Sequence, residues 1–269
     1  MSTGDRSAAG EGRPMVSVRR EGPVTTISLD RPEKRNALNT ELCRQLVASF
    51  DEVGRDDEVR CIVLAAEGPV FCAGQDLQFT LDADLDAWEE YRLWNRRMRD
   101  TIQNVPKPVV GRIQGHALGG GMWIATSCDL IVASTDAEFA MREIRAGVHS
   151  GGAHMFSVGR ARAMEINMLG RRLPAAEAER WGLINRAVPP DELDAAVRDF
   201  TDELVALPPL GLKYTKVAAN LLLKMAGFDA VLDAGPGHPY LFLTDDAREA
   251  KQSILERREP RFTGRRPQR

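Results

Sequence analysis

Short apolar runs without polar alternation constrain the fold of this chain more than any other feature. One is CIVLAAE at residues 61–67, and the others lie in PVVGRIQG (108–115) and DLIVAS (129–134). A strand that is apolar on both faces suits a parallel sheet covered by helices on both sides. A helical pattern, with Thr40 expected to cap it, precedes the first run. We therefore predict an α/β fold.

The last part of the chain has a different pattern, because from Pro190 onward its apolar residues follow helical spacing. Strands followed by helices, and then helices alone, predict an α/β core with a helical C-terminal region. The boundaries that we expect are a polar, disordered tail at 1–14, the core at 15–205 and the helical region at 206–269.

The charge balance argues against a polyanionic or lipid partner. The 269 residues carry a formal net charge of −3, and the basic segments 159–172 and 264–269 contain no motif of stacking aromatic residues. We interpret both segments as solvated surface and expect no nucleic-acid partner. No apolar run approaches about 20 residues, so we expect no membrane-spanning segment.

The cysteines and the N-terminus indicate a cytoplasmic protein. Cys43, Cys61, Cys72 and Cys128 form no C-x-x-C pair and lie in no cluster of zinc ligands. The first fourteen residues lack the apolar segment of a secretory signal. Reduced thiols and no bound metal are the expectation.

Two glycine-containing turns stand out as candidate sites. They are EGPVFCAGQDL (67–77) and HALGGGMWIATSCD (116–129), and each follows a predicted strand and leads toward a helix. Amide N–H groups at such turns point outward and carry partial positive charge. Either turn alone is explained as a tight connection, but two that face each other would form a two-donor cradle for a developing oxyanion.

Together with three further segments, these turns resemble the crotonase superfamily, the enoyl-CoA hydratase/isomerase group. The further segments are LDRPEKRNALN (29–39), CDLIVAS (128–134) and TDDAREAKQSILERREPRF (244–262). The resemblance implies a spiral core of ββα repeats with a C-terminal helical trimerisation region. It also implies an acyl-CoA substrate, a homotrimer or dimer of trimers, and no cofactor beyond the coenzyme A of the substrate.

The resemblance assigns roles to individual positions. The oxyanion donors would be the N–H groups of Gln75 and Gly120. The loop from Arg35 to Leu38 resembles the stretch that lines coenzyme A, and Phe262 resembles a residue that packs on its adenine in some members. The expected substrate- and CoA-binding residues are Arg35, Ala37, Leu38, Ala73, Gly74, Asp76, Leu77, Gly119, Trp123 and Phe262.

The acid/base residues predict the reaction. Hydratases of this family place two glutamates over the thioester, and here only the downstream one is present, as Glu143 in MREIRAG. Trp123 stands at the other position, and its indole exchanges no proton at neutral pH. A single glutamate of raised pKa can move a proton from one carbon to another, so we favour double-bond isomerisation of an enoyl-CoA.

Two alternatives remain open at this point. His149 is a candidate second base, which would allow hydration of an enoyl-CoA or hydrolysis of an acyl-CoA. A non-catalytic protein that binds acyl-CoA or assists assembly is the other. The acyl chain itself is not predicted, although Trp88, Tyr91, Trp94 and Met98 are candidate walls of its pocket or core residues of a helix.

Overall fold

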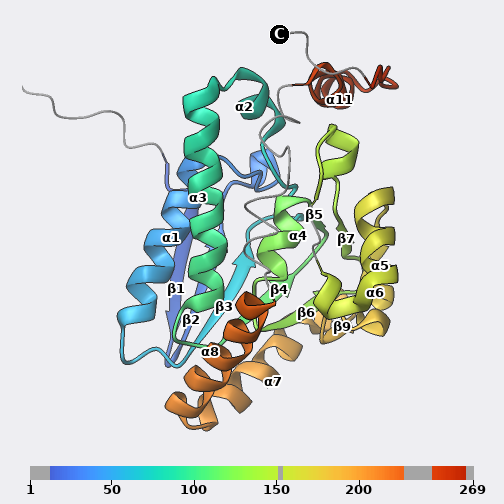
Figure 1. Cartoon of the computed structure of the whole chain (residues 1–269). Coiled ribbons are helices and arrows are strands. Elements are labelled where there is room, and N and C mark those ends of the chain that lie inside the picture. Colours follow the sequence, from blue (N-terminus) through green and yellow to red (C-terminus); the bar gives the residue numbers. More distant parts are fainter. Residues whose placement is uncertain (1–12, 151–153, 227–243, 265–269) are drawn as a thin grey trace, which may run out of the picture.

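A six-stranded sheet forms the centre of the molecule. The computed structural model describes residues 13–150, 154–226 and 244–264 (Figure 1). The strand order is β1-β2-β3-β4-β6-β9, with β1 antiparallel to β2 and every later pair parallel. The strands are β1 (Val16–Glu21), β2 (Val24–Leu29), β3 (Cys61–Ala66), β4 (Val109–Ile113), β6 (Leu130–Ser134) and β9 (Arg186–Val188).

Helices cover both faces of this sheet, as the apolar runs predict. Every residue of β3 is buried, and its side chains alternate between two apolar clusters. Ile62 and Leu64 belong to the larger cluster, which also holds residues of α1 and α3, whereas Cys61 and Val63 face α7. Both faces of β3 are therefore removed from water, which accounts for its lack of polar alternation.

The helices follow the strands in the expected order. Asn39, rather than Thr40, caps the first one, because its side chain accepts a hydrogen bond from the Leu42 amide at 2.9 Å. The α-helices are α1 (Thr40–Arg55), α2 (Leu77–Asp82), α3 (Leu85–Asn104), α4 (Gly120–Ala125), α5 (Met155–Leu169), α6 (Ala175–Trp181), α7 (Leu193–Ala206), α8 (Pro209–Met225) and α11 (Asp245–Glu256). Short 3-10 helices are η1 (Pro32–Lys34), η2 (Glu143–Ala146) and η3 (Pro190–Glu192).

A second, three-stranded sheet was not predicted from the sequence. It consists of β5 (His116–Leu118), β7 (Glu138–Ala140) and β8 (Leu173–Pro174). Its strands are too short for a periodic signal, yet they set the geometry of the triple-glycine turn. The parallel pairing of β5 with β7 and a hydrogen bond from the Gly119 amide to the Ala140 carbonyl (2.7 Å) place that turn beside the segment entering η2.

The described residues cover only part of the two end regions for which domain boundaries were expected. Most of the predicted tail, residues 1–12, lies outside the described residues. Beyond α7 the described residues form α8 and α11 and no strand, in the region expected to be helical. No helix within the described ranges is long and apolar enough to span a bilayer.

Candidate active site

The two glycine-containing turns meet directly. Cys72 and Ala117 form an isolated parallel bridge, in which the Cys72 amide donates to His116 and the Leu118 amide donates to Cys72, both at 2.9 Å. A Cβ atom added to Gly120 would lie 3.9 Å from the Gln75 nitrogen. One added to Gly74 would lie 2.5 Å from the Leu118 carbonyl oxygen. This contact explains why the turn needs glycine at residue 74, where φ is also +90°.

The amides of Gln75 and Gly120 are available to a ligand. Neither donates a hydrogen bond to any residue within the described part of the chain, whereas the neighbouring Gly119 and Asp76 amides both do. Gly120 is the first residue of α4, so its N–H has no acceptor within the helix. Two N–H groups without an acceptor among the described residues therefore lie where the two glycine-containing turns meet.

The loop before α1 is fastened to the same turn. The Leu38 amide donates to the Gly74 carbonyl at 2.8 Å, and the Asp76 amide donates back to the Leu38 carbonyl at 2.9 Å. A 2.9 Å ion pair between Arg31 and Asp76, with both side chains largely buried, adds a second connection. The predicted CoA-lining loop, Arg35 to Leu38, thus lies directly beside the predicted oxyanion donors.

Asn36 organises this loop, a role that sequence reasoning did not assign. Its side chain is fully buried, and its amide donates to the carbonyls of Glu67 and Val70 at 2.9 and 2.8 Å. Its side-chain oxygen accepts from the Arg31 amide at 2.8 Å. Arg35 and Asn36 both have positive φ, a conformation that asparagine tolerates better than most residues. An asparagine in a polar loop was the only available signal.

Glu143 lies on the opposite side of the triple-glycine turn. It begins η2, and a Cβ atom added to Gly119 would meet its Oε1 at 3.2 Å. Its Oε2 is buried and accepts no hydrogen bond from the described residues. Burial raises the pKa of this carboxyl group to about 7, against a smaller lowering by its own backbone and by the Arg99 guanidinium.

The neighbouring arginines do not pair with Glu143. Arg142 donates to the Gly170 carbonyl at 3.2 Å, and Arg145 donates to the carbonyls of Gly170 and Leu169 at 3.3 Å. Glu143 is therefore not a surface carboxylate in an ion pair with its sequence neighbours. Its raised pKa makes it both an available base and an available acid near neutral pH.

Trp123 stands in α4, directly after the triple-glycine turn. It lies one helical turn after Gly119, to whose carbonyl its amide donates at 3.0 Å, and its side chain packs against the main core. Two polar side chains contact the indole: the His154 ring, with centroids 5.3 Å apart, and the Arg99 guanidinium, 5.1 Å from the ring centroid. No second carboxylate occupies the position.

A histidine in contact with Trp123 is His154. His154 is 6% exposed, has φ of +64°, and its burial lowers its pKa to about 4, so it is neutral at neutral pH. His149 is half-buried with a pKa that burial also lowers. The sequence favoured His149 as a second base because of its place after Glu143, and the backbone turn at residue 154 could not be anticipated.

Helix α3 faces the site with polar as well as apolar residues. Tyr91, Asn95 and Arg99 are spaced four apart and so share one face of the helix. Asn95 donates to the Tyr91 hydroxyl at 3.2 Å, and Tyr91 and Arg99 both interact electrostatically with Glu143. Among the other candidates for the acyl wall, Met98 is a core residue and Trp88 contacts the Tyr91 ring.

Trp94 lies between two arginine side chains. The guanidinium groups of Arg44 in α1 and Arg97 in α3 lie 5.3 and 5.2 Å from its ring centroid. Arg97 is largely exposed and forms a 3.8 Å ion pair with Asp51. Trp94 is partly buried and also packs against the main core, which fits the core alternative for this residue.

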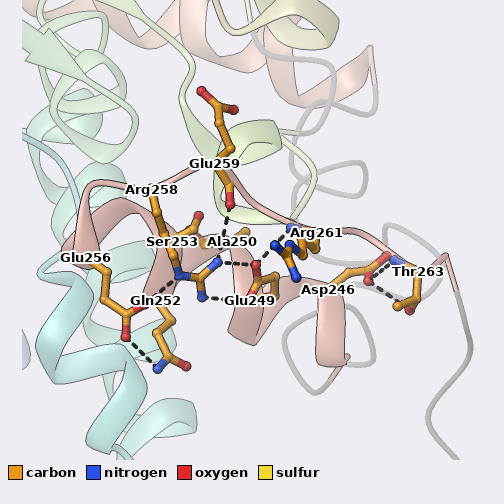
Figure 2. A network of polar contacts seen from close by, with 10 residues as sticks. All are labelled: Asp246, Glu249, Ala250, Gln252, Ser253, Glu256, Arg258, Glu259, Arg261 and Thr263. Carbon is orange, nitrogen blue, oxygen red and sulfur yellow. Dashed lines mark hydrogen bonds and ion pairs between the residues drawn. The ribbon is translucent and has the colours of Figure 1, made fainter.

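The C-terminal segment is held against α11, and Phe262 lies within it. Asp246 accepts a hydrogen bond from the Thr263 amide at 2.7 Å, and Glu249 accepts from the Arg261 amide at 2.8 Å (Figure 2). Asp246 also accepts from the Gly264 amide at 2.8 Å. Phe262 is 55% exposed on this anchored backbone. Its side chain is therefore accessible to a ligand.

Helix α11 itself contacts the segment that carries Glu143. Gly147, which ends η2 with φ of +75°, lies so close to Ala247 that an added Cβ atom would be 2.6 Å from the Ala247 Cα atom. The remaining predicted binding residues, Ala37, Ala73 and Leu77, belong to the fastened loop, the first glycine turn and the start of α2. The described residues contain no cluster suited to a metal ion.

Comparison with known proteins places this geometry in one family. The model of the Enoyl-CoA hydratase/isomerase family matches residues 19–265. A 1,2-epoxyphenylacetyl-CoA isomerase of Escherichia coli K12 is 33% identical, covering 91% of this chain and 96% of its own. A probable enoyl-CoA hydratase of Mycobacterium tuberculosis CDC 1551 is 30% identical, covering 93% and 98%.

Solved structures with a similar fold belong to the same family. An enoyl-CoA hydratase from Mycobacterium avium subsp. paratuberculosis K-10 superposes with a TM-score of 0.84 at 29% identity, covering 93% of this chain and 99% of its own. An enoyl-CoA hydratase/isomerase from Pseudoalteromonas atlantica T6c gives 0.82 at 26% identity, with coverage of 93% and 100%. The α/β spiral fold expected from the resemblance is thereby confirmed. The chain belongs to the enoyl-CoA hydratase/isomerase family, the crotonase superfamily, and is an enzyme of its lyase or isomerase type.

Proposed function

We propose that this enzyme shifts the double bond of an enoyl-CoA, with Glu143 as its acid/base. The observation that carries the proposal is a single buried carboxylate of pKa about 7 beside Gly119, with Trp123 where a second carboxylate would stand. The family and the relatives that act on CoA thioesters support the substrate class. No resident cofactor enters the mechanism.

The proposed reaction is a 1,3 proton shift. Glu143 as carboxylate removes the proton from C2 of a 3-enoyl thioester, and the electron pair moves into the thioester carbonyl to form a dienolate. The N–H groups of Gln75 and Gly120 stabilise the oxyanion, each contributing about 3 kcal/mol to the lowering of the barrier. Protonated Glu143 then delivers the proton to C4, and the 2-enoyl thioester is released with no net gain or loss of atoms.

Trp123 opposes addition of water in this proposal. Hydration needs one group to orient and deprotonate a water molecule and another to protonate carbon. The indole supplies neither function and occupies the volume of such a group. Hydration or hydrolysis would require a histidine in place of the second carboxylate, with His149 as the first candidate from sequence.

We further propose that α8 joins copies of this chain into a trimer or a dimer of trimers. Its large apolar side chains face outward, including Leu210, Tyr214, Leu222 and Met225, each at least 63% exposed. A contiguous apolar surface on one helix is typical of a protein–protein interface.

The reaction is tested by incubating the purified enzyme with 3-hexenoyl-CoA and, separately, with crotonyl-CoA in deuterated water. Product mass and double-bond position are read by mass spectrometry and NMR. We expect 2-hexenoyl-CoA with no increase in mass corresponding to added water, and with the proton from C2 at C4; deuterium at C4 would report the fraction of Glu143 that exchanges with solvent before the proton is returned. Glu143→Gln should abolish this conversion while acyl-CoA still binds.

Three other outcomes would contradict the proposal. Added water in either product would establish hydration, and the His149→Ala and His154→Ala variants would then identify the second base. Release of free coenzyme A would establish hydrolysis. Binding of a broad panel of acyl-CoA thioesters without turnover would favour a non-catalytic role.

A further inference from the structure

One side chain, that of Cys72, connects the loop before α1 to the first glycine turn. Its thiol donates a hydrogen bond to the Asn36 carbonyl at 3.0 Å, and its sulfur accepts one from the Gly74 amide at 3.4 Å. Neither of these two backbone groups has another hydrogen-bond partner in the described ranges. Asn36 is fully buried, so the thiol satisfies a carbonyl group that water does not reach.

The thiol can act as a donor because it stays protonated. Cys72 is fully buried, and burial raises the pKa of its thiol to about 12, against a smaller lowering by the Gly74 amide. At neutral pH the sulfur therefore carries the proton that its bond to Asn36 requires. The same burial makes it a poor nucleophile, which argues against a role in covalent chemistry.

The thiol belongs to a set of four hydrogen bonds that join residues 35–38 to residues 72–76. The other three link backbone amides to backbone carbonyls, at 2.8 to 3.0 Å. A side-chain substitution leaves those three donors and acceptors in place, whereas it can remove the bond that Cys72 makes.

This set of bonds fixes the direction of the Gln75 N–H. The Gly74 carbonyl and the Gln75 N–H belong to one trans peptide group, so they point in opposite directions. Because the carbonyl accepts from the Leu38 amide at 2.8 Å, the N–H points away from the loop. Through the Gly74 amide, the thiol holds the peptide group that comes directly before.

Cys72 also lies against the second glycine turn. A Cβ atom added to Gly121 would be 2.4 Å from the Cys72 carbonyl oxygen and 2.7 Å from the Cys72 Cβ atom. Gly121 follows Gly120 at the start of α4. One residue therefore contacts both turns that present the candidate oxyanion donors.

We propose that Cys72 is a positioning residue, whose thiol holds the Gln75 N–H in the direction that polarises the thioester carbonyl. The inference rests on the proposed function, because it takes the Gln75 and Gly120 amides as the oxyanion donors. A hydrogen bond weakens steeply as its angle departs from linearity, so a donor that has turned stabilises the oxyanion less. The thiol acts through the backbone and takes no part in proton transfer.

The test compares Cys72→Ala with Cys72→Ser, two variants that differ by one hydroxyl group. Serine can donate to Asn36 and accept from Gly74, whereas alanine can do neither. With 3-hexenoyl-CoA we expect kcat of Cys72→Ala to fall about tenfold, less than for outright loss of an oxyanion donor. Its KM should change by less than about threefold, since the affected bond is strongest in the transition state. Cys72→Ser should keep most of the wild-type kcat.

The carbonyl group of a bound thioester gives a measurement that does not depend on turnover. Hydrogen bonds to its oxygen lower the stretching frequency, which infrared difference spectroscopy detects with hexanoyl-CoA carrying carbon-13 at the carbonyl carbon. We expect part of the wild-type lowering to be lost in Cys72→Ala and kept in Cys72→Ser. A purely structural role of the thiol would leave this frequency unchanged in every folded variant.

Cys61→Ala is the matched control. Cys61 is also fully buried, but it lies in the apolar cluster on the α7 side of the sheet. This variant should equal wild type in kcat and in carbonyl frequency. Thermal unfolding establishes that each variant is folded, and Cys72→Val, which fills volume without a hydrogen bond, replaces Cys72→Ala if that variant does not fold.

The outcomes separate the two proposals. If Cys72→Ala keeps the wild-type carbonyl frequency, or if the alanine and serine variants lose it equally, positioning by the thiol is overturned while the acyl-CoA enzyme stands. A raised KM at unchanged kcat would also overturn it, because Cys72 would then serve the binding of coenzyme A. If the wild-type enzyme binds hexanoyl-CoA without lowering the frequency below that of the free thioester, the proposed oxyanion pair itself fails.

Discussion

The two halves of the candidate site are built from different parts of the polypeptide. On the thioester side, backbone groups make the site: the Gln75 and Gly120 amides are presented by glycine turns that hydrogen bonds fasten together. On the side that we propose for the acyl group, side chains of α3, α4 and the residue before α5 contact one another, namely Arg99, Trp123 and His154. A backbone site recognises what all substrates share, and a side-chain site can change with the acyl group.

The largest expected effect lies at the point where the two halves meet. Glu143→Gln removes the only proposed acid/base while keeping the size of the side chain. We expect kcat to fall about 1000-fold, within the usual contribution of a general acid/base. Steady-state kinetics and a titration with a saturated acyl-CoA would check this, and a residual rate within a few-fold of wild type would assign the proton transfer to another group.

The same substitution has a consequence for stability. Because burial raises the pKa of Glu143 from 4.5 to about 7, the native state holds its proton more tightly than the unfolded chain does. Native stability therefore falls as pH rises from about 4.5 to 7, by up to roughly 3 kcal/mol if the whole shift is expressed. Glu143→Gln should remove this loss.

Urea unfolding at pH 5 and pH 8 measures that difference. The free energy of unfolding of wild type should drop relative to that of the variant between the two pH values. If the free energy of unfolding changes equally with pH in both proteins, the charged form of Glu143 is not buried.

Gly119→Ala examines the contact between the backbone half and Glu143. The added methyl group would lie 3.2 Å from the carboxylate oxygen, at a φ of +52° that disfavours alanine. We expect kcat/KM to fall about 10- to 100-fold, since a small displacement of a catalytic group is costly. Gly22→Ala is the control, because its φ is +60° but its added methyl group meets nothing within 4 Å.

If kcat/KM falls equally in these two variants, the loss comes from backbone strain alone. We expect the loss of kcat/KM in Gly119→Ala alone, and a larger destabilisation of that variant in thermal unfolding, because Gly119 combines a φ of 52° with a ψ of −120° that alanine rarely adopts.

The smallest effect concerns pH. The Arg99 guanidinium lowers the pKa of Glu143 against the larger effect of burial, so Arg99→Met should raise it. The acidic limb of the kcat/KM profile, expected near pH 7 in wild type, should then move to higher pH. An unchanged profile would mean that Arg99 does not influence the pKa of Glu143. Arg97→Met is the control and should leave the profile unchanged, because the Arg97 side chain lies at the outer surface.

The contrast between the halves also explains what the sequence could predict. The strands and glycine turns are encoded locally, by continuous apolar runs and by residues such as Gly74 that tolerate positive φ. Glu143 was assigned through its motif. The placements of Asn36, Arg99 and His154 were not predicted, because each depends on a contact between segments distant in the sequence or on a single backbone turn.

The contact between Gly147 and Ala247 joins the candidate site to a helix that is synthesised later than the rest of the site. The backbone of α11 rests on the glycine that ends the turn of Glu143, and no side chain separates them. During synthesis the glutamate, both glycine turns and the sheet leave the ribosome well before this helix does. The proposed acid/base residue therefore gains this support only after α11 has been made, so that shorter nascent chains hold every proposed catalytic group without this contact.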